Sequence, residues 1–199
     1  IPTASSDDPR YVEYIAKKFE PLGCQIQNML LHSQDYSKKQ LSDMILGADI
    51  VYVGGGNTLM MMRKWRRLGI DKLLKKAWQA GKIMCGSSAG SICWYESGHS
   101  DSMYYYNPKK WDYIRVRGLG FIPYIHCPHY DSKTGNKKRK NDFKRMLKKY
   151  PGKVGLACED EVALVFEDEE MRVLSQPGKH AHRVSWKAGK YREGVLPNE

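Results

Sequence analysis

Twice in the first half of the chain, a short apolar run ends in a cluster of small residues, and a helix-like pattern follows directly. The first run spans residues 48–53 and leads into GGGNT at 54–58, and the second spans 82–85 and leads into GSSAG at 86–90. Apolar runs that alternate with helices are typical of a parallel sheet with both faces covered. The repeated unit predicts an α/β fold.

The remaining patterns extend this layout. Asp8 and Pro9 favour the start of a helix that ends before Pro21, and further helices are predicted at residues 37–46, 59–67, 71–80, from 91 onward and at 142–150. Strands are predicted at residues 24–31, 121–127, 154–158 and 162–166, followed by a hairpin-like tail. Residues 98–118 are predicted to form loops.

Length and composition limit the chain further. Its 199 residues, 41% of them apolar, predict a single domain over residues 1–199. No stretch reaches the roughly 20 apolar residues of a membrane span. The chain begins at Ile1 as if at the exit of a strand, so we expect an N-terminal strand to precede it. Five cysteines without CxxC spacing indicate buried, reduced thiols and a cytoplasmic protein without structural zinc.

The net charge of +11 has two interpretations. Residues 133–149 are rich in Lys and Arg, with Asp142 as their one acid, and the segment 63–67 adds further cations. Such a distribution is compatible with a nucleic-acid footprint. Few aromatic residues interleave with the basic run, however, and its charges spread around the helix. We therefore favour a solvated surface and do not expect nucleic acid as a partner.

The turn at residues 86–90 has the pattern of a nucleophile elbow, in which a serine lies on a tight strand-to-helix turn. Small residues flank such a serine because side chains there collide with neighbouring backbone. Ser88 takes this position, and the amide of Ala89 lies at the next helix start, where it favours an oxyanion. The alternative is a tight turn without catalytic function.

The glycine turn at residues 54–58 also joins a strand to a helix. One interpretation is a phosphate-binding turn, although G-x-G-x-x-G spacing and a Walker lysine are absent. The other is a second oxyanion donor. Carboxyl ends of adjacent parallel strands meet at one sheet edge, so the amides of Gly56 and Ala89 would contact the same oxygen.

A catalytic serine needs a base, and His129 follows the predicted strand 121–127 on a loop. His126 is expected to lie in the strand or the core. His180 and His182 share one face of a late strand, and we expect two solvent-exposed side chains there rather than metal ligands.

An acidic side chain must then fix the tautomer of the imidazole. Glu159 and Asp160 directly follow the predicted strand 154–158, at another strand end. A run of acids is also typical of a solvated turn, and Asp101 and Asp131 are competing candidates.

The motifs GGGNT at 54–58, GSSAG at 86–90 and PHY at 128–130, in this order, resemble the peptidase E-like serine hydrolases. These form peptidase family S51 and include α-aspartyl dipeptidase and cyanophycinase. The resemblance runs from Ile1 to Val165. It implies a flavodoxin-like three-layer α/β/α sandwich with a mostly parallel sheet, related to class I glutamine amidotransferases, and a triad of Ser, His and Asp or Glu.

Carried over to this sequence, the resemblance assigns Ser88 as the nucleophile, His129 as the base, and the amides of Gly56 and Ala89 as the oxyanion hole. The order Ser, His, acid differs from that of the α/β hydrolases.

The other assignments depend on the alignment. Counting back from residue 162 gives Asp160 as the acid, and counting forward from 155 gives Glu159; we favour Asp160 and keep Glu159 beside it. Asn57 and Arg139 are the candidate substrate-binding residues, although the surroundings of Arg139 depart from the aspartyl dipeptidase motif. The arginine-rich pattern of cyanophycinase is absent.

Together these features predict a serine-type peptidase that hydrolyses small peptides through an acyl-enzyme, without a metal or cofactor. An acidic, aspartyl residue at the cleaved bond is one option. We expect a monomer or homodimer without membrane contact. The alternatives are an esterase with the same residues and a basic nucleic-acid-binding protein on a non-catalytic scaffold.

Overall fold

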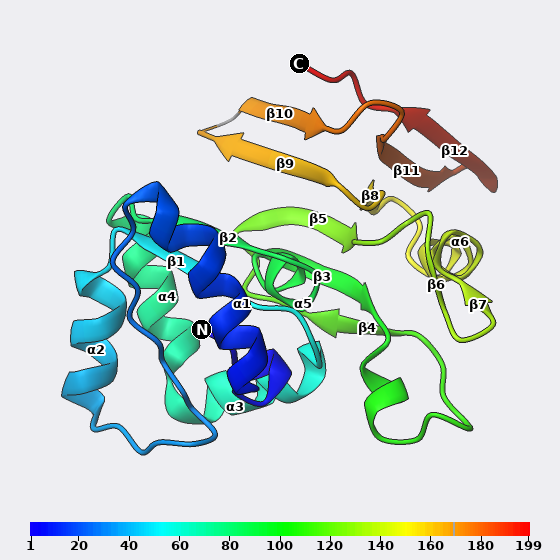
Figure 1. Cartoon of the computed structure of the whole chain (residues 1–199). Coiled ribbons are helices and arrows are strands. Elements are labelled where there is room, and N and C mark those ends of the chain that lie inside the picture. The colour runs from blue at the N-terminus through cyan, green and yellow to red at the C-terminus, as the bar shows by residue number, and fades with distance from the viewer. Residues whose placement is uncertain (169) are drawn as a thin grey trace. The chain divides into compact units, whose positions relative to one another are not determined.

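The computed structural model describes residues 1–168 and 170–199 (Figure 1). The chain divides into two compact units, Ile1–Trp94 and Tyr95–Glu199. Each unit has its own helices and strands and is described by itself. That the whole of residues 1–199 forms one domain stays a prediction.

The first unit contains both strand–turn–helix elements predicted from the sequence. Strands β1 (Ile50–Val53) and β2 (Ile83–Gly86) pair in parallel, with Val53 opposite Gly86. The helices are α1 (Pro9–Phe19), α2 (Lys38–Gly47), α3 (Thr58–Leu68), α4 (Ile70–Gln79) and α5 (Ala89–Ile92), with 3₁₀ turns at Thr3–Ser5 and Glu20–Leu22. The four helices predicted between residues 8 and 80 are confirmed to within a few residues at each end, but the helix predicted from residue 91 onward is wrong beyond Ile92, where α5 ends, and strand β3 follows from Tyr95.

Side-chain caps explain where these helices begin. The carboxylate of Asp8 accepts the Arg10 N–H at 2.9 Å, and Ser37 and Gln40 form a reciprocal capping box at α2. Each cap satisfies backbone donors that a helix start leaves open. The apolar faces then meet in a core around the fully buried Trp65, whose indole N–H donates to the Thr3 hydroxyl at 3.2 Å.

The strand predicted at residues 24–31 is wrong, because this segment pairs with no strand among the described residues. Its apolar pattern does report burial: Met29 and Leu31 are buried, whereas Gln27 is exposed. Its backbone finds other partners, and the Leu30 N–H donates to the Tyr36 hydroxyl at 3.1 Å. Alternation tells which side chains face the core, not whether a neighbouring strand completes the ladder.

The second unit is built on a six-stranded sheet with the strand order β12-β11-β8-β5-β3-β4. These strands are β3 (Tyr95–Ser100), β4 (Ile114–Arg117), β5 (Ile122–Cys127), β8 (Val154–Cys158), β11 (Ala181–Lys187) and β12 (Lys190–Val195). Strand β5 runs parallel to β3 and β8, and the other pairs are antiparallel. The α/β class is confirmed, but this sheet is mixed where a mostly parallel one was expected. Tight connections such as that between β11 and β12 permit only antiparallel pairing.

The prediction of loops over residues 98–118 is wrong where β3 and β4 form. These strands carry polar residues that escape a search for hydrophobic alternation. The buried Ser97 accepts a hydrogen bond from Arg115 Nε at 2.8 Å, and the buried His99 bonds Asp142 through Nε2 at 3.0 Å. Polar side chains satisfied in this way can be buried without great cost.

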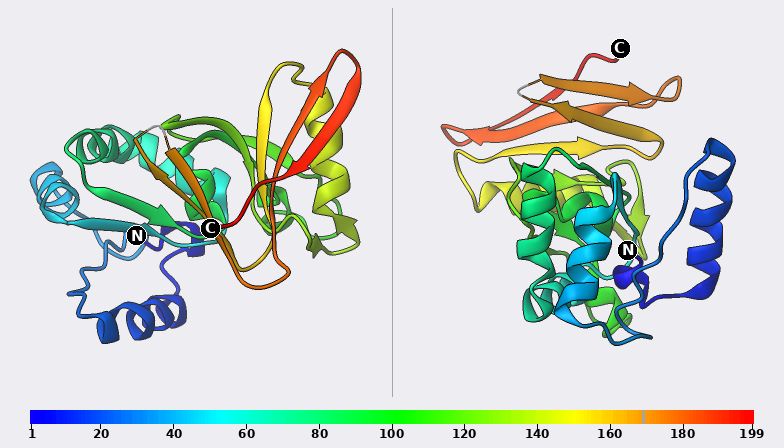
Figure 2. Two further views of the ribbon diagram at one scale, coloured as in Figure 1. Left: turned by 90° about the horizontal axis from the view of Figure 1, so that it is seen from above. Right: turned by 90° about the vertical axis from the view of Figure 1, so that its left-hand side faces the viewer.

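Two further hairpins complete the second unit, β9 (Val162–Glu167) with β10 (Glu170–Ser175) and β6 (Lys133–Thr134) with β7 (Lys137–Lys138). In Figure 2 the strands β9 and β10 lie side by side and are coloured yellow-orange to orange. A 3₁₀ turn spans Ser102–Tyr105, and α6 (Arg139–Lys148) begins ahead of its predicted start at Asp142.

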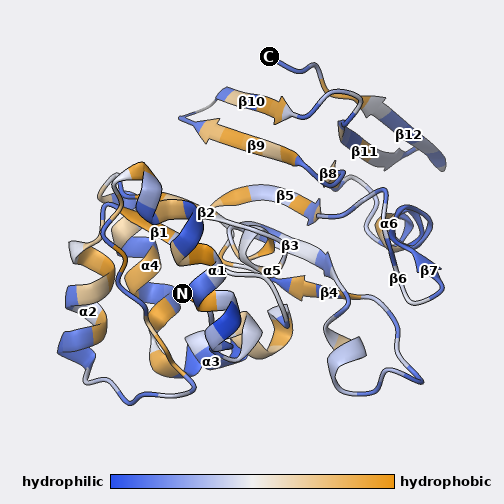
Figure 3. Cartoon of the chain, in the orientation of Figure 1, coloured by the Kyte–Doolittle hydropathy of each residue, from blue (hydrophilic) through white to orange (hydrophobic). Residues whose placement is uncertain are grey.

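Helix α6 is largely hydrophilic (Figure 3), yet it covers the sheet with one apolar edge. Phe143 and Leu147 are fully buried in a cluster with Ile125 of β5 and Val184 of β11. Arg139, at the start of the helix, is buried, whereas Lys140, Lys144, Arg145 and Lys148 are exposed to solvent. No helix within the described residues has the length and apolar character needed to cross a membrane.

A buried histidine makes the stability of the second unit sensitive to pH. His126 is 3% exposed and its Nδ1–H donates to the Leu156 carbonyl at 3.0 Å, so it is a core residue, as expected. Burial lowers the pKa of His126 from 6.5 to about 4. The unfolded chain then binds a proton that the folded protein does not, and stability falls as the pH drops from 6.5 towards 4.

We expect protonation of His126 to lower the free energy of unfolding by up to about 3 kcal/mol between pH 6.5 and pH 4, and to change it no further below pH 4. Urea denaturation across this pH range measures it. In His126→Asn, a side-chain amide can still donate to Leu156 but does not titrate, so its curve should be flatter. Identical pH dependence in both proteins would contradict this assignment.

Candidate active site

Ser88 lies on the turn between β2 and α5 in a conformation that serine rarely adopts. Its backbone angles are φ 55° and ψ −114°. A positive φ is unfavourable for a residue with a side chain, and such strain is concentrated at functional sites. A serine with a strained backbone on a strand-to-helix turn is what a nucleophile elbow requires, and the role of Ser88 as a nucleophile stays a prediction.

Two glycines allow this turn to pack against the end of β1. A Cβ on Gly90 would lie 1.9 Å from the Val53 carbonyl oxygen, and one on Gly86 would lie 2.5 Å from the Gly90 oxygen. The Ser87 N–H also donates to the Val53 oxygen at 3.2 Å. Because backbone atoms occupy the space of the missing side chains, only glycine fits at either position.

The glycine turn after β1 lies beside the serine. A Cβ on Gly55 would be 3.3 Å from Ser88 Cβ, and Gly56 has φ 131° with its Cα against the Ala4 carbonyl. Over residues 1–168 and 170–199, the amides of Gly56 and Ala89 donate no hydrogen bond. Two free amides near a serine hydroxyl are the donors an oxyanion hole requires. The Tyr11 hydroxyl accepts the Gly55 N–H at 3.0 Å, a contact with this turn that no motif in the sequence indicates.

In the second unit, His129 and Asp160 are hydrogen-bonded. His129 follows β5 with a positive φ of 54°, and its Nδ1–H donates to Asp160 Oδ1. Ser132 Oγ donates to the other carboxylate oxygen at 2.6 Å. Partial burial alone would raise the pKa of Asp160, but the hydrogen bonds from Ser132 and His129 outweigh it and keep this pKa below its usual value. The carboxylate is therefore ionised, and it orients the imidazole through Nδ1.

The alternative acid Glu159 faces elsewhere. Its carboxylate accepts the His180 N–H at 3.1 Å and contacts His182 Nε2 at 3.2 Å. His182 is buried, with Glu193 within 3.3 Å of its Nδ1, so the expectation of two solvent-exposed histidines is wrong for His182. His182 lies in β11, whereas His180 precedes that strand. Of the two glutamates that contact His182, Glu159 lies 23 residues before it and Glu193 lies on the adjacent strand β12.

The other two candidate acids also have different partners. Asp131 accepts the backbone N–H of Asp160 at 2.9 Å and pairs with Lys179 at 2.7 Å, so it supports the acid rather than the imidazole. Asp101 pairs with Arg139. Of the candidate acids, Asp160 is the one that contacts His129.

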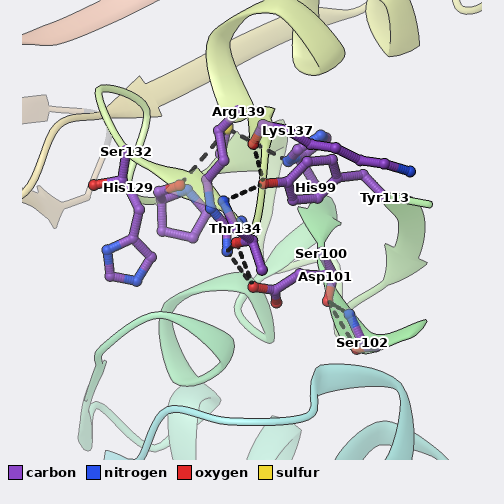
Figure 4. A network of polar contacts seen from close by, with 12 residues as sticks. His99, Ser100, Asp101, Ser102, Tyr113, His129, Ser132, Thr134, Lys137 and Arg139 are labelled. Atoms are coloured by element: carbon purple, nitrogen blue, oxygen red, sulfur yellow. Dashed lines mark hydrogen bonds and ion pairs between the residues drawn. The ribbon is translucent and has the colours of Figure 1, made fainter. Parts of the chain in front are cut away.

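The two predicted substrate-binding residues make contacts inside the protein. Asn57 is 5% exposed, and its Oδ1 caps α3 by accepting the Met60 N–H at 3.0 Å. Arg139 is buried, and its guanidinium points to Asp101 and Thr134 (Figure 4). Substrate contacts for both residues stay predictions.

The cysteines are free thiols, and three of them are buried, although Cys24 and Cys85 are partly exposed. Burial raises the pKa of the Cys158 thiol to about 12, which makes it a poor nucleophile. In the part of the chain that the structure describes, no group of three His, Cys, Asp or Glu side chains has an arrangement suited to a metal ion.

The sequence is similar to those of known peptidases. The sequence model of Peptidase family S51 matches residues 1–174. The uncharacterized peptidase YgaJ of Bacillus subtilis (strain 168) is 33% identical over 199 residues, which cover 99% of this chain and 81% of that protein. A probable alpha-aspartyl dipeptidase of Drosophila melanogaster is 25% identical over 160 residues, covering 78% of this chain and 62% of that protein.

The fold is shared with a solved structure as well. The crystal structure of a peptidase from an acI-B1 Actinobacterium superposes with a TM-score of 0.73 at 15% identity, covering 99% of this chain and 79% of that one. These matches agree with the resemblance noted from the three motifs. The chain belongs to peptidase family S51.

Proposed function

We propose that the protein is a serine-type peptidase that hydrolyses small peptides, with Ser88 as the nucleophile. The observation that carries this proposal is the strained backbone of Ser88 on a strand-to-helix turn, beside the unused amides of Gly56 and Ala89. Backbone strain of this kind is found mainly where a function requires it. Here it would hold the hydroxyl of a nucleophilic serine at the end of a sheet strand.

His129 and Asp160 complete the proposed triad. Since the Nδ1–H of His129 donates to Asp160, Nε2 is free to take the proton of the Ser88 hydroxyl as its oxygen attacks the peptide carbonyl. The amides of Gly56 and Ala89 stabilise the tetrahedral oxyanion. His129 then protonates the leaving amine, the C–N bond breaks, and a water molecule hydrolyses the acyl-enzyme by the same steps.

Finer points belong to the same proposal. We infer a preference for an acidic residue at the cleaved bond from the net charge of +11 and from the name of the Drosophila relative. A flavodoxin-like three-layer arrangement, a single domain over residues 1–199 and a cytoplasmic setting are also inferred, from the motif resemblance, the chain length and the cysteine usage.

A substrate screen tests the proposal. Wild-type protein is incubated with Asp-Xaa, isoAsp-Xaa and neutral dipeptides, and with nitrophenyl esters, and the products are quantified by chromatography. We expect hydrolysis of peptides, with Asp-containing substrates preferred, because a cationic protein favours acidic ligands.

Two results would contradict it. Turnover of esters with no cleavage of any peptide would indicate an esterase that uses the same residues. Binding of DNA or RNA that weakens steeply with added salt, without hydrolysis of either bond type, would indicate a non-catalytic scaffold.

A further inference from the structure

A cavity of about 330 Å³ lies in the second unit, against the segment that follows His129. Ser132, which donates to Asp160, lines it, and so do Lys133, Lys138 and Lys140. This volume is at the small end of the range for ligand pockets. A group held in the cavity would therefore contact the same short segment that fixes the acid of the proposed triad.

Two of the three lysines in the cavity carry unbalanced charge. Lys140 pairs with Glu193 at 2.8 Å, and Asp131, the acid in the cavity wall, pairs with Lys179. Lys133 and Lys138 form no ion pair with any described residue. The cavity therefore has a net positive lining that the protein itself does not neutralise.

The positions of Lys133 and Lys138 bring their two positive charges close together. Lys133 and Lys138 are direct partners across the hairpin of β6 and β7. Like charges opposite each other destabilise a strand pair, so the hairpin carries a cost that an anion between the two ammonium groups would remove. Carboxylates bind well to such groups through charge-assisted hydrogen bonds.

The hairpin is held in place by a buried polar network (Figure 4). The Tyr113 hydroxyl accepts the Thr134 N–H at 3.1 Å and donates to the Lys137 carbonyl at 3.0 Å. Arg139, only 5% exposed, bonds Asp101 and also Thr134, at 3.3 Å. These contacts fix the backbone of both strands, so the hairpin itself need not become ordered when an anion binds.

We propose that Lys133 and Lys138 form a carboxylate-binding subsite for acidic peptides, and that Arg139 positions their hairpin instead of contacting the ligand. This rests on the proposed function, because it assigns part of the substrate of the same site. The carboxylate belongs either to an acidic side chain or to the C-terminus of the peptide.

The test compares wild type with the double variant Lys133→Gln/Lys138→Gln. Substrates are amidated peptides of two to four residues, each made with Asp and with Asn, and a neutral peptide with a free C-terminal carboxylate. We expect KM for the Asp peptides to rise at least about 10-fold with kcat unchanged, and KM for the Asn amides to stay constant. A rise confined to the free-carboxylate peptide would place the C-terminus in the subsite.

A control removes the same charge elsewhere. Lys72→Gln/Lys75→Gln lowers the net charge equally on the exposed face of α4 and should leave all KM values unchanged. If KM rises equally for the Asp and Asn amides, if no peptide responds to the cavity substitutions, or if the control shifts KM as much, the subsite is overturned.

Binding to catalytically inactive Ser88→Ala protein separates the two proposals. Fluorescent Asp and Asn peptides are titrated with and without the lysine substitutions. Lysine-dependent binding of the Asp peptide, in a protein that cleaves no peptide as wild type, would retain the subsite and reject the peptidase. Cleavage without lysine dependence would do the reverse.

Asp101→Asn tests the positioning by Arg139. Freed from its carboxylate partner, a guanidinium that contacts the ligand directly would lower KM for the Asp peptides. A guanidinium that only anchors the hairpin would raise KM for the Asp peptides and leave the Asn peptides unaffected, as we expect.

Discussion

Replacing Ser88 by Ala is expected to lower kcat/KM for small peptides by a factor of about 10⁴ to 10⁶, because no other group supplies the attacking oxygen. Alanine has the same Cβ as serine, so the strain at φ 55° is unchanged and the fold should be retained. Circular dichroism and thermal unfolding check the fold, and product chromatography measures the rate. A fluorophosphonate probe should add mass to the peptide that contains residue 88 in wild type but not in Ser88→Ala.

Ser87→Ala is the matched control for this substitution. Ser87 is the exposed neighbour in the same turn, and the bond that it makes to Val53 comes from its backbone. We expect its activity to stay within a few-fold of wild type. Full turnover by Ser88→Ala, or loss of labelling in Ser87→Ala, would remove Ser88 from the nucleophile position.

Asp160→Asn is expected to reduce kcat by up to about 10⁴-fold, the size of loss known for this change in a serine protease triad. The amide can donate to Nδ1 of His129, which favours the tautomer with the proton on Nε2 and removes the base. The lowered pKa of Asp160 keeps the wild-type carboxylate ionised to a lower pH than an ordinary aspartate. Protonation of wild-type Asp160 should therefore reduce the difference between the two proteins only in solutions more acidic than the usual range of an Asp side chain.

Glu159→Gln separates the two adjacent acids. Its side chain contacts His182 and the backbone of His180, so the variant should keep near-normal kcat. Stopped assays at several pH values give kcat for both variants. A large loss in Glu159→Gln with little change in Asp160→Asn would reverse the assignment of the acid.

Local sequence patterns identified the features that are determined locally. The apolar runs before residues 54 and 86, and the glycines within each turn, follow from backbone requirements that neighbouring residues alone satisfy. The same holds for the start of α1 at Asp8. The likeness of these turns to a known family was then enough to nominate Ser88 and His129.

Features that depend on residues distant in sequence could not be predicted from local sequence patterns. Residues 24–31 could form a strand only if another strand lay beside them to accept the pairing. Strand β3 could not be predicted from hydrophobic alternation, because it carries polar residues whose hydrogen-bond partners are distant in sequence. Glu159 and Asp160 are adjacent in sequence, and the contacts of Ser132 and His182 distinguish them. Each of these is a tertiary interaction with no local signal.

The tip of the β6–β7 hairpin is a suitable site for substitutions in laboratory evolution. Gly135 turns the chain at φ 56°, a conformation that a side chain would strain, whereas Asn136 beside it is exposed and has no such restriction. Substitutions at residue 136 would change the rim of the neighbouring cavity, while Tyr113 and Arg139 keep the base of the hairpin fixed. A library at residue 136 that retains Gly135 is thus a route to altered selectivity if the cavity binds the substrate as proposed.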